Sequence, residues 1–159
     1  MVTDQVAPGG LEQVRTLLNT WLIPNDTRTP TDRFHGSPTL RDLRDDLRRA
    51  VERDADADLL VTAWIDRLGV LPVVREGRIA LQARKQGEAW ETLRDVLQSM
   101  MDGSWHRLKA CPDCRWIFYD NSRNGQKRWC LMNAGGPNGR ACGTIAKVRA
   151  YRERNRSDE

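Results

Sequence analysis

The chain has 159 residues, of which 39% are hydrophobic and 30% are charged, and its formal net charge is +4. This composition is typical of a soluble globular protein, and the length favours one domain or one domain with a small module. No apolar run approaches the length of a membrane-spanning helix, which excludes a protein that crosses a membrane in that way. Residues 1–20 show no basic stretch followed by an apolar one, so we expect no signal peptide and a cytoplasmic location.

The charge is distributed unevenly along the chain. Residues 1–105 carry 14 Lys or Arg and 17 Asp or Glu, whereas residues 106–159 carry 12 and 5, a net charge of +7. This segregation predicts two parts with different partners, the basic part facing something anionic. A solvated basic tail is the alternative interpretation.

The first third of the chain predicts two helices joined by a loop. Apolar residues recur at helical spacing over residues 11–23, and Pro24 would end that helix. Residues 24–38 are rich in Pro, Asp and Thr, which is typical of a loop. Ser37 followed by Pro38 predicts the start of a second, highly charged helix. Its expected buried stripe consists of Leu40, Leu43, Leu47, Ala50 and Val51.

Two more helices are expected around a hairpin. The acids at residues 54–58 suit a helix N-terminus, and Gly69 suits a helix C-cap. Two β-capable runs within residues 70–87 flank Glu76-Gly77, which predicts a hairpin turn. Residues 88–101 return to helical periodicity, so residues 1–105 are expected to form a mostly helical domain with a small hairpin. The buried face expected for the helix after residue 54 consists of Leu59, Leu60, Ala63, Trp64 and Leu68.

All four cysteines lie in the basic third, with the spacing Cys-x2-Cys-x15-Cys-x11-Cys. In a reducing compartment such a set points to metal or redox chemistry rather than to disulfides. Four thiolates form one of the usual closed shells of structural Zn²⁺, with no position left for a catalytic water. A thioredoxin-like pair, an iron–sulfur cluster and unconnected free thiols are the alternatives. The predicted ligands are Cys111, Cys114, Cys130 and Cys142; His106 is a less suitable substitute, and His35 lies in a polar loop.

The residues around the cysteines predict a small metal-centred module. Trp116, Phe118 and Trp129 would cover a metal in a segment too small to build a core of its own. Residues 115–129 are expected to form a β-hairpin, and residues after Cys142 a basic helix with Ile145 and Val148 facing inward. A hairpin followed by a helix that donates a late ligand is the plan of a treble-clef zinc finger. The exposed cations are predicted to be Arg123, Lys127 and Arg128 on the hairpin and Lys147, Arg149, Arg152, Arg154 and Arg156 on the helix.

The motifs RLKACPDCRWIFYDNSRN, RWCLM and CGTIAKVRAYRER resemble the CGNR-type zinc finger. The family pattern Asp-x-Ser-Arg-Asn begins here at Asp120, and Arg-Trp-Cys-x-Met runs from Arg128 to Met132. Residues 11–105, with LLNTW and PVVREGRIALQ, are similar to the ABATE domain that precedes the finger in that family. Thr144 and Ile145 replace the Asn and Arg of the name-giving motif, and the interval from Cys130 to Cys142 is longer than usual and rich in glycine.

The resemblance implies an α+β, mostly helical protein with two parts, an ABATE-like domain over residues 1–105 and a finger over residues 106–159. It also implies a bacterial transcription regulator, associated with stress, that binds one structural Zn²⁺ and contacts DNA through the basic residues. The N-terminal domain would form a homodimer or sense a signal. The alternative is a zinc-stabilised module that binds an acidic protein or RNA. The sequence shows no nucleophile–base set, no glycine-rich phosphate loop and no paired carboxylates, so we expect no enzymatic activity.

Overall fold

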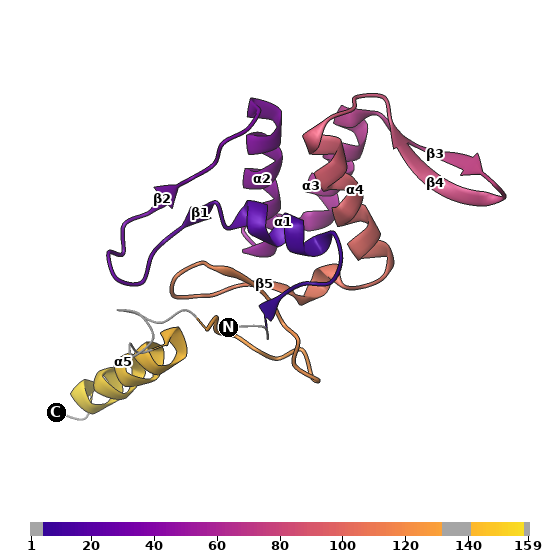
Figure 1. The fold of residues 1–159 in the computed structure, drawn as a ribbon. Helices are drawn as coiled ribbons and strands as arrows, with labels where there is room; N and C mark the ends of the chain where they lie inside the picture. The colour runs from indigo at the N-terminus through magenta and orange to yellow at the C-terminus, as the bar shows by residue number, and fades with distance from the viewer. Residues whose placement is uncertain (1–4, 132–140, 158–159) are drawn as a thin grey trace.

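The computed structural model describes residues 5–131 and 141–157, and these form a mixed α+β structure (Figure 1). Three two-stranded antiparallel sheets accompany the helices, and each sheet pairs strands that are neighbours in the chain. No helix in this described part is long and apolar enough to cross a membrane. The helices are α1 (Leu11–Leu18), α2 (Pro38–Val51), α3 (Ala57–Leu68), α4 (Glu88–Met101) and α5 (Cys142–Ser157), with a short 3-10 turn at Trp105–Arg107.

Helix α2 begins where the sequence predicts. The Ser37 side chain accepts a hydrogen bond from the backbone N–H of Leu40, and Pro38 occupies the first turn, where its missing N–H costs nothing. All five residues of the expected stripe, Leu40, Leu43, Leu47, Ala50 and Val51, are buried. The stripe packs against α1, α3 and α4, so α2 lies at the centre of the helical core.

Helix α1 is shorter than predicted. It ends at Leu18, and Trp21–Leu22 forms strand β1, which pairs antiparallel with β2 (Thr31–Asp32). The guanidinium of Arg48 donates to the carbonyls of Leu18 at 2.7 Å and Trp21 at 3.0 Å. These carbonyls therefore find a partner outside the helix, which lets the chain leave helical geometry before Pro24.

Helix α3 has the predicted ends but a different buried face. Asp56 caps its first turn, and Gly69 ends it with a φ of 64°. Of the five expected core residues, only Trp64 and Leu68 are buried, together with Val61. The Trp64 Nε1 donates to Asp46 of α2 at 2.9 Å, which fixes the rotation of α3 and leaves Leu59 72% exposed.

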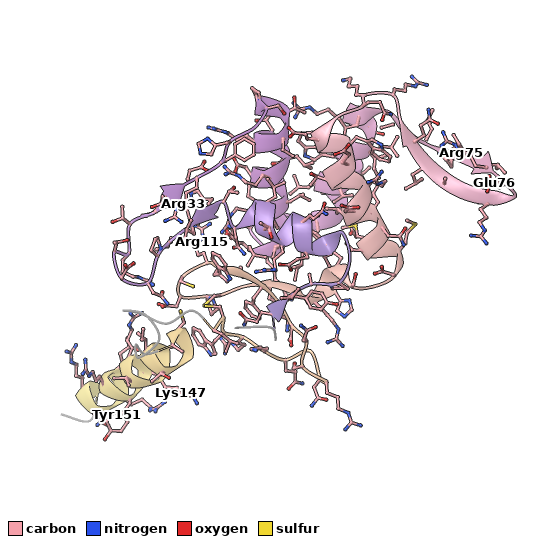
Figure 2. All side chains as sticks on the ribbon, in the orientation of Figure 1. Arg33, Arg75, Glu76, Arg115, Lys147 and Tyr151 are labelled. Carbon is pink, nitrogen blue, oxygen red and sulfur yellow. The ribbon has the colours of Figure 1, made fainter. Side chains whose placement is uncertain are left out.

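The predicted hairpin is confirmed as β3 (Val70–Arg75) and β4 (Arg78–Ala83). Its turn residues Glu76 and Gly77 have φ values of 50° and 72°, as a two-residue hairpin turn requires. The hairpin projects from the helical core, with Arg75 and Glu76 at its tip (Figures 1 and 2). The expected helix over residues 88–101 is confirmed as α4.

The last hairpin lies earlier in the chain than the predicted residues 115–129. Strands β5 (Leu108–Ala110) and β6 (Ile117–Tyr119) pair across the Cys-x-x-Cys turn, and residues 120–131 contain no strand. Leu108, Ile117 and Tyr119 belong to the same buried cluster as α1, α2 and α4. The hairpin thus packs on the helices with one face and carries two cysteines at its turn.

Candidate metal centre

Four cysteine sulfurs converge at one buried point. Cys111 and Cys114 lie in the β5–β6 turn, Cys130 follows the irregular segment after β6, and Cys142 is the first residue of α5. All four sulfurs lie within 4.8 Å of one another, and every one of these residues is buried. None of the four cysteines forms a disulfide, and the Sγ atoms of Cys114 and Cys130 are 3.4 Å apart, too far for one.

The turn that carries the first two cysteines is held by its own backbone. The Cys111 N–H donates to the Trp116 carbonyl at 2.9 Å, and the Arg115 N–H donates to the Cys111 carbonyl at 2.8 Å. Arg115 has a φ of 59°, in the left-handed region that closes such a turn. These bonds place two sulfurs side by side on the tip of the hairpin.

The thiols cannot all ionise without a cation beside them. Hydrogen bonds from Cys114 and Cys130 lower the pKa of Cys111, so one thiolate is stabilised. The hydrogen bond to Cys111 raises the pKa of Cys114 to about 12, and bonds to both of these sulfurs raise the pKa of Cys130. Burial raises the pKa of Cys142, against the effect of a hydrogen bond from Asn25. A divalent cation at the centre supplies the charge that would let all four deprotonate.

The donor set fits zinc. A tetrahedron with Zn–S bonds of about 2.3 Å places its sulfurs about 3.8 Å apart. The Cys130 and Cys142 sulfurs are 3.7 Å apart, and the whole set lies within 4.8 Å. Four thiolates fill a tetrahedral shell, so a zinc held here is structural and links the hairpin to α5.

Aromatic side chains shelter the sulfurs, as the sequence predicts. Phe118 is fully buried among the cysteines, and Trp116 and Trp129 pack against the same cluster while remaining partly exposed. A Cβ built on Gly143 would lie 3.1 Å from the Trp129 ring. Glycine therefore follows Cys142 because the indole lies against this part of the helix.

Asp120 organises the segment between β6 and Cys130. Its fully buried carboxylate accepts hydrogen bonds from Lys109 Nζ at 2.6 Å, from the Ser122 N–H at 2.9 Å and from the Lys127 N–H at 2.9 Å. Burial alone would raise the pKa of Asp120, but the bonds from Lys109 and Ser122 outweigh it and lower the pKa to about 2. The carboxylate thus replaces a strand pairing in holding residues 120–127.

Residues 107–155 match the family model of the CGNR zinc finger. The match includes all four cysteines and covers about a third of the chain, and we refer to these residues below as the finger. A search of curated proteins finds no match for the chain. The similarity of residues 11–105 to the ABATE domain stays a prediction.

The predicted cations fall on two parts of the finger. Arg123 and Arg128 are exposed and Lys127 is partly buried in the irregular segment, whereas the cations of α5 are all exposed. Ile145 and Val148 of α5 are only partly buried. Met132 and the glycine-rich loop over residues 132–140 lie outside the described residues. The helical cations are Lys147, Arg149, Arg152, Arg154 and Arg156.

Two groups of contacts around the metal centre are not predictable from local sequence patterns. Asn25 donates to the Cys142 sulfur at 3.1 Å, and Arg28 donates to the Asp113 carbonyl at 3.0 Å. Both lie in the polar loop before β2, where no local pattern marks them as neighbours of a metal. The second group is the ion pair of Lys109 with Asp120. Asp120 begins the family pattern, but its pairing with Lys109 could have been suspected only from the hairpin register.

Proposed function

We propose that the protein is a DNA-binding transcription regulator in which zinc holds the finger and α5 contacts the duplex. The observation that carries this proposal is the charge of α5, where five exposed cations share 16 residues with one acid, Glu153. Such a helix is about 24 Å long, and a major groove about 12 Å wide admits an α-helix. Lys147 and Tyr151 extend from it into solvent (Figure 2).

The position of α5 supports this role. The helix lies apart from the α1–α4 core, and its N-terminus is anchored at the metal centre through Cys142 (Figure 1). Arg149 is 3.9 Å from the Asp113 carboxylate, whereas Lys147, Arg152, Arg154 and Arg156 form no ion pair within the described ranges. Cations presented on a rigid, zinc-anchored helix can contact phosphates and release counterions.

A duplex of about 25 base pairs, labelled with a fluorophore, tests the proposal by anisotropy at several salt concentrations. We expect R152Q/R154Q to weaken binding and to reduce the slope of log K against log[salt] by about 2, one for each lost phosphate contact. The matched control is R75Q/R78Q, which removes the same charge from the β3–β4 hairpin. Equal losses in both double variants would show a general charge effect and contradict a specific role for α5.

Competition separates DNA from the rival partners. Single-stranded RNA, an acidic peptide and unlabelled duplex are added in turn to the labelled complex. We expect unlabelled duplex to compete best. Stronger competition by RNA or by the acidic peptide would favour the interaction module over the DNA regulator.

A second copy of the chain is part of the proposal. One zinc-finger module buries about 600–1,000 Å² on DNA, which is small for tight binding, and two fingers in a homodimer would double it. Sedimentation of the zinc-loaded chain with and without duplex tests this stoichiometry. A single chain bound tightly to one duplex would contradict it.

A further inference from the structure

The metal centre is completed by a residue from the other end of the chain. Asn25 is 8% exposed, and its Nδ2 lies 3.1 Å from the Sγ of Cys142, 117 positions away. An amide N–H that donates to a thiolate reduces the negative charge left on the sulfur. Asn25 lies outside the finger, in the loop Pro24–Arg28, which we call the strap.

The strap also holds the Cys-x-x-Cys turn. Arg28 Nη1 donates to Asn25 Oδ1 at 3.0 Å, and Arg28 Nη2 donates to the Asp113 carbonyl at 3.0 Å. The Arg28 guanidinium also lies 3.3 Å from the Asp113 carboxylate. A continuous chain of contacts therefore runs from Cys142 through Asn25 and Arg28 to the turn between Cys111 and Cys114.

The strap is preformed for these contacts. The Arg28 N–H donates to the Pro24 carbonyl at 2.9 Å, which closes the loop on itself. Arg28 has a φ of 55°, a backbone geometry that costs a non-glycine residue energy and persists where surrounding contacts impose it. The two ends of the strap are held by β1 and β2.

Charge explains why these contacts matter to the metal. Zinc with four thiolates carries a net charge of −2 in a buried site, and such a charge requires donors around it. We propose that Asn25 and Arg28 are positioning residues of the zinc centre: Asn25 donates to the zinc-bound Cys142 thiolate, and Arg28 holds both the Asn25 amide and the Asp113 turn in place. Zinc affinity then depends on a loop outside the finger, and this holds whether or not the protein binds DNA.

Two substitutions at Asn25 separate this role from packing. N25L removes the donor, whereas N25D keeps the volume and the acceptor for Arg28 but directs a carboxylate oxygen at the sulfur. We expect zinc affinity, measured against a chromophoric chelator on the full chain, to fall about 10- to 100-fold in N25L and at least as much in N25D. If Asn25 only fills space, N25D would match the wild type and the proposal would be overturned. T29A, an exposed change in the adjoining loop, is the control and should leave affinity unchanged.

Replacing zinc with Co²⁺ gives a spectroscopic signal that does not change when a variant is merely less stable. Co²⁺ in a four-thiolate shell has sulfur-to-metal charge-transfer bands, whose energy follows the electron density on the sulfurs. We expect these bands to shift in folded N25D and to stay unchanged in T29A. Unshifted bands in folded N25D would overturn the proposal. If neither Asn25 variant folds, R28A tests the proposal, because Arg28 is exposed and its replacement should leave the fold intact. We expect R28A to bind zinc about 10-fold more weakly than the wild type. Wild-type zinc affinity in R28A would overturn the proposal.

Discussion

Asn19 pairs with both backbone groups of Ile117. Its Nδ2 donates to the Ile117 carbonyl at 2.7 Å, and its Oδ1 accepts from the Ile117 N–H at 2.9 Å. The side chain is buried and continues strand β6 in the manner of a neighbouring strand. One amide thus joins the end of α1 to the hairpin that carries two of the cysteines.

Replacing Asn19 tests this link. N19A leaves the buried Ile117 N–H without a partner and leaves the Ile117 carbonyl with only the long bond from Arg15 at 3.5 Å, so we expect the free energy of unfolding to fall by about 1–3 kcal/mol. Urea denaturation followed by circular dichroism measures the loss. N124A, an exposed asparagine in the finger, should change stability by less than about 0.5 kcal/mol. A loss in N19A as small as that of N124A would contradict the pairing.

Arg48 is a buried cation that joins α2 to the hairpin. It donates to the Arg115 carbonyl at 2.9 Å in addition to the carbonyls of Leu18 and Trp21, and it pairs with Glu52 at 2.5 Å. R48M would leave Glu52 with Arg115 as its remaining cation and would remove the donor from three backbone carbonyls, so we expect a loss of about 3 kcal/mol. R49M, at the exposed neighbouring position, is the matched control and should be nearly neutral. Thermal unfolding of both variants in zinc-saturated buffer distinguishes them.

What the sequence predicted correctly rests on local signals. The Ser37-Pro38 start of α2, the Glu76-Gly77 turn and the Gly69 cap each depend on residues a few positions apart. The role of the four cysteines as a common metal site is also predictable, because cysteine is a usual ligand of closed zinc sites and the spacing of the four cysteines is visible in the sequence.

What the sequence could not predict depends on contacts between distant positions. Arg44 and Arg48 belong to a helix whose charges suggest a solvated face, yet they are 1% and 5% exposed. Asn25 contacts Cys142 only because the strap folds over the start of α5. The hairpin was placed too late in the chain because the turn residues after Asp120 suggested a tip, whereas that carboxylate holds the segment without strands.

Zinc content is the most direct prediction. Elemental analysis of protein purified without added metal should give one zinc per chain, and C142S should lose it or bind it more weakly. Because metal binding contributes to folding, a chelator should lower the melting temperature of the wild type. Iron in place of zinc would redirect the interpretation to a cluster, and absence of any metal would contradict a common site for the four cysteines.

Asp120 predicts a specific dependence of stability on pH. The pKa of Asp120 is lower in the folded protein, about 2, than in the unfolded chain, about 4, so the charged carboxylate stabilises the fold. This stabilisation is complete above about pH 4 and is lost as the pH falls through about 2. D120N should therefore cost about 2 kcal/mol at neutral pH. The difference between wild type and variant in urea titrations should narrow from pH 4 to pH 2. A constant difference between wild type and D120N would argue against the ionised pair with Lys109.

Gly143 gives a prediction in which two effects have opposite signs. Alanine favours a helix over glycine by up to about 1 kcal/mol, so G143A at an open position of α5 would stabilise the protein. Here the added Cβ would lie 3.1 Å from two atoms of the Trp129 ring, which also covers the cysteine cluster. We expect overcrowding to prevail, with a loss of about 1 kcal/mol and weaker zinc binding as the indole is displaced. T144A, one position further along the same helix and exposed, should gain helix propensity without overcrowding, so it should leave zinc affinity unchanged and should not destabilise the protein. A more stable G143A with unchanged zinc affinity would show that the indole yields freely, and that glycine is not required beside Cys142.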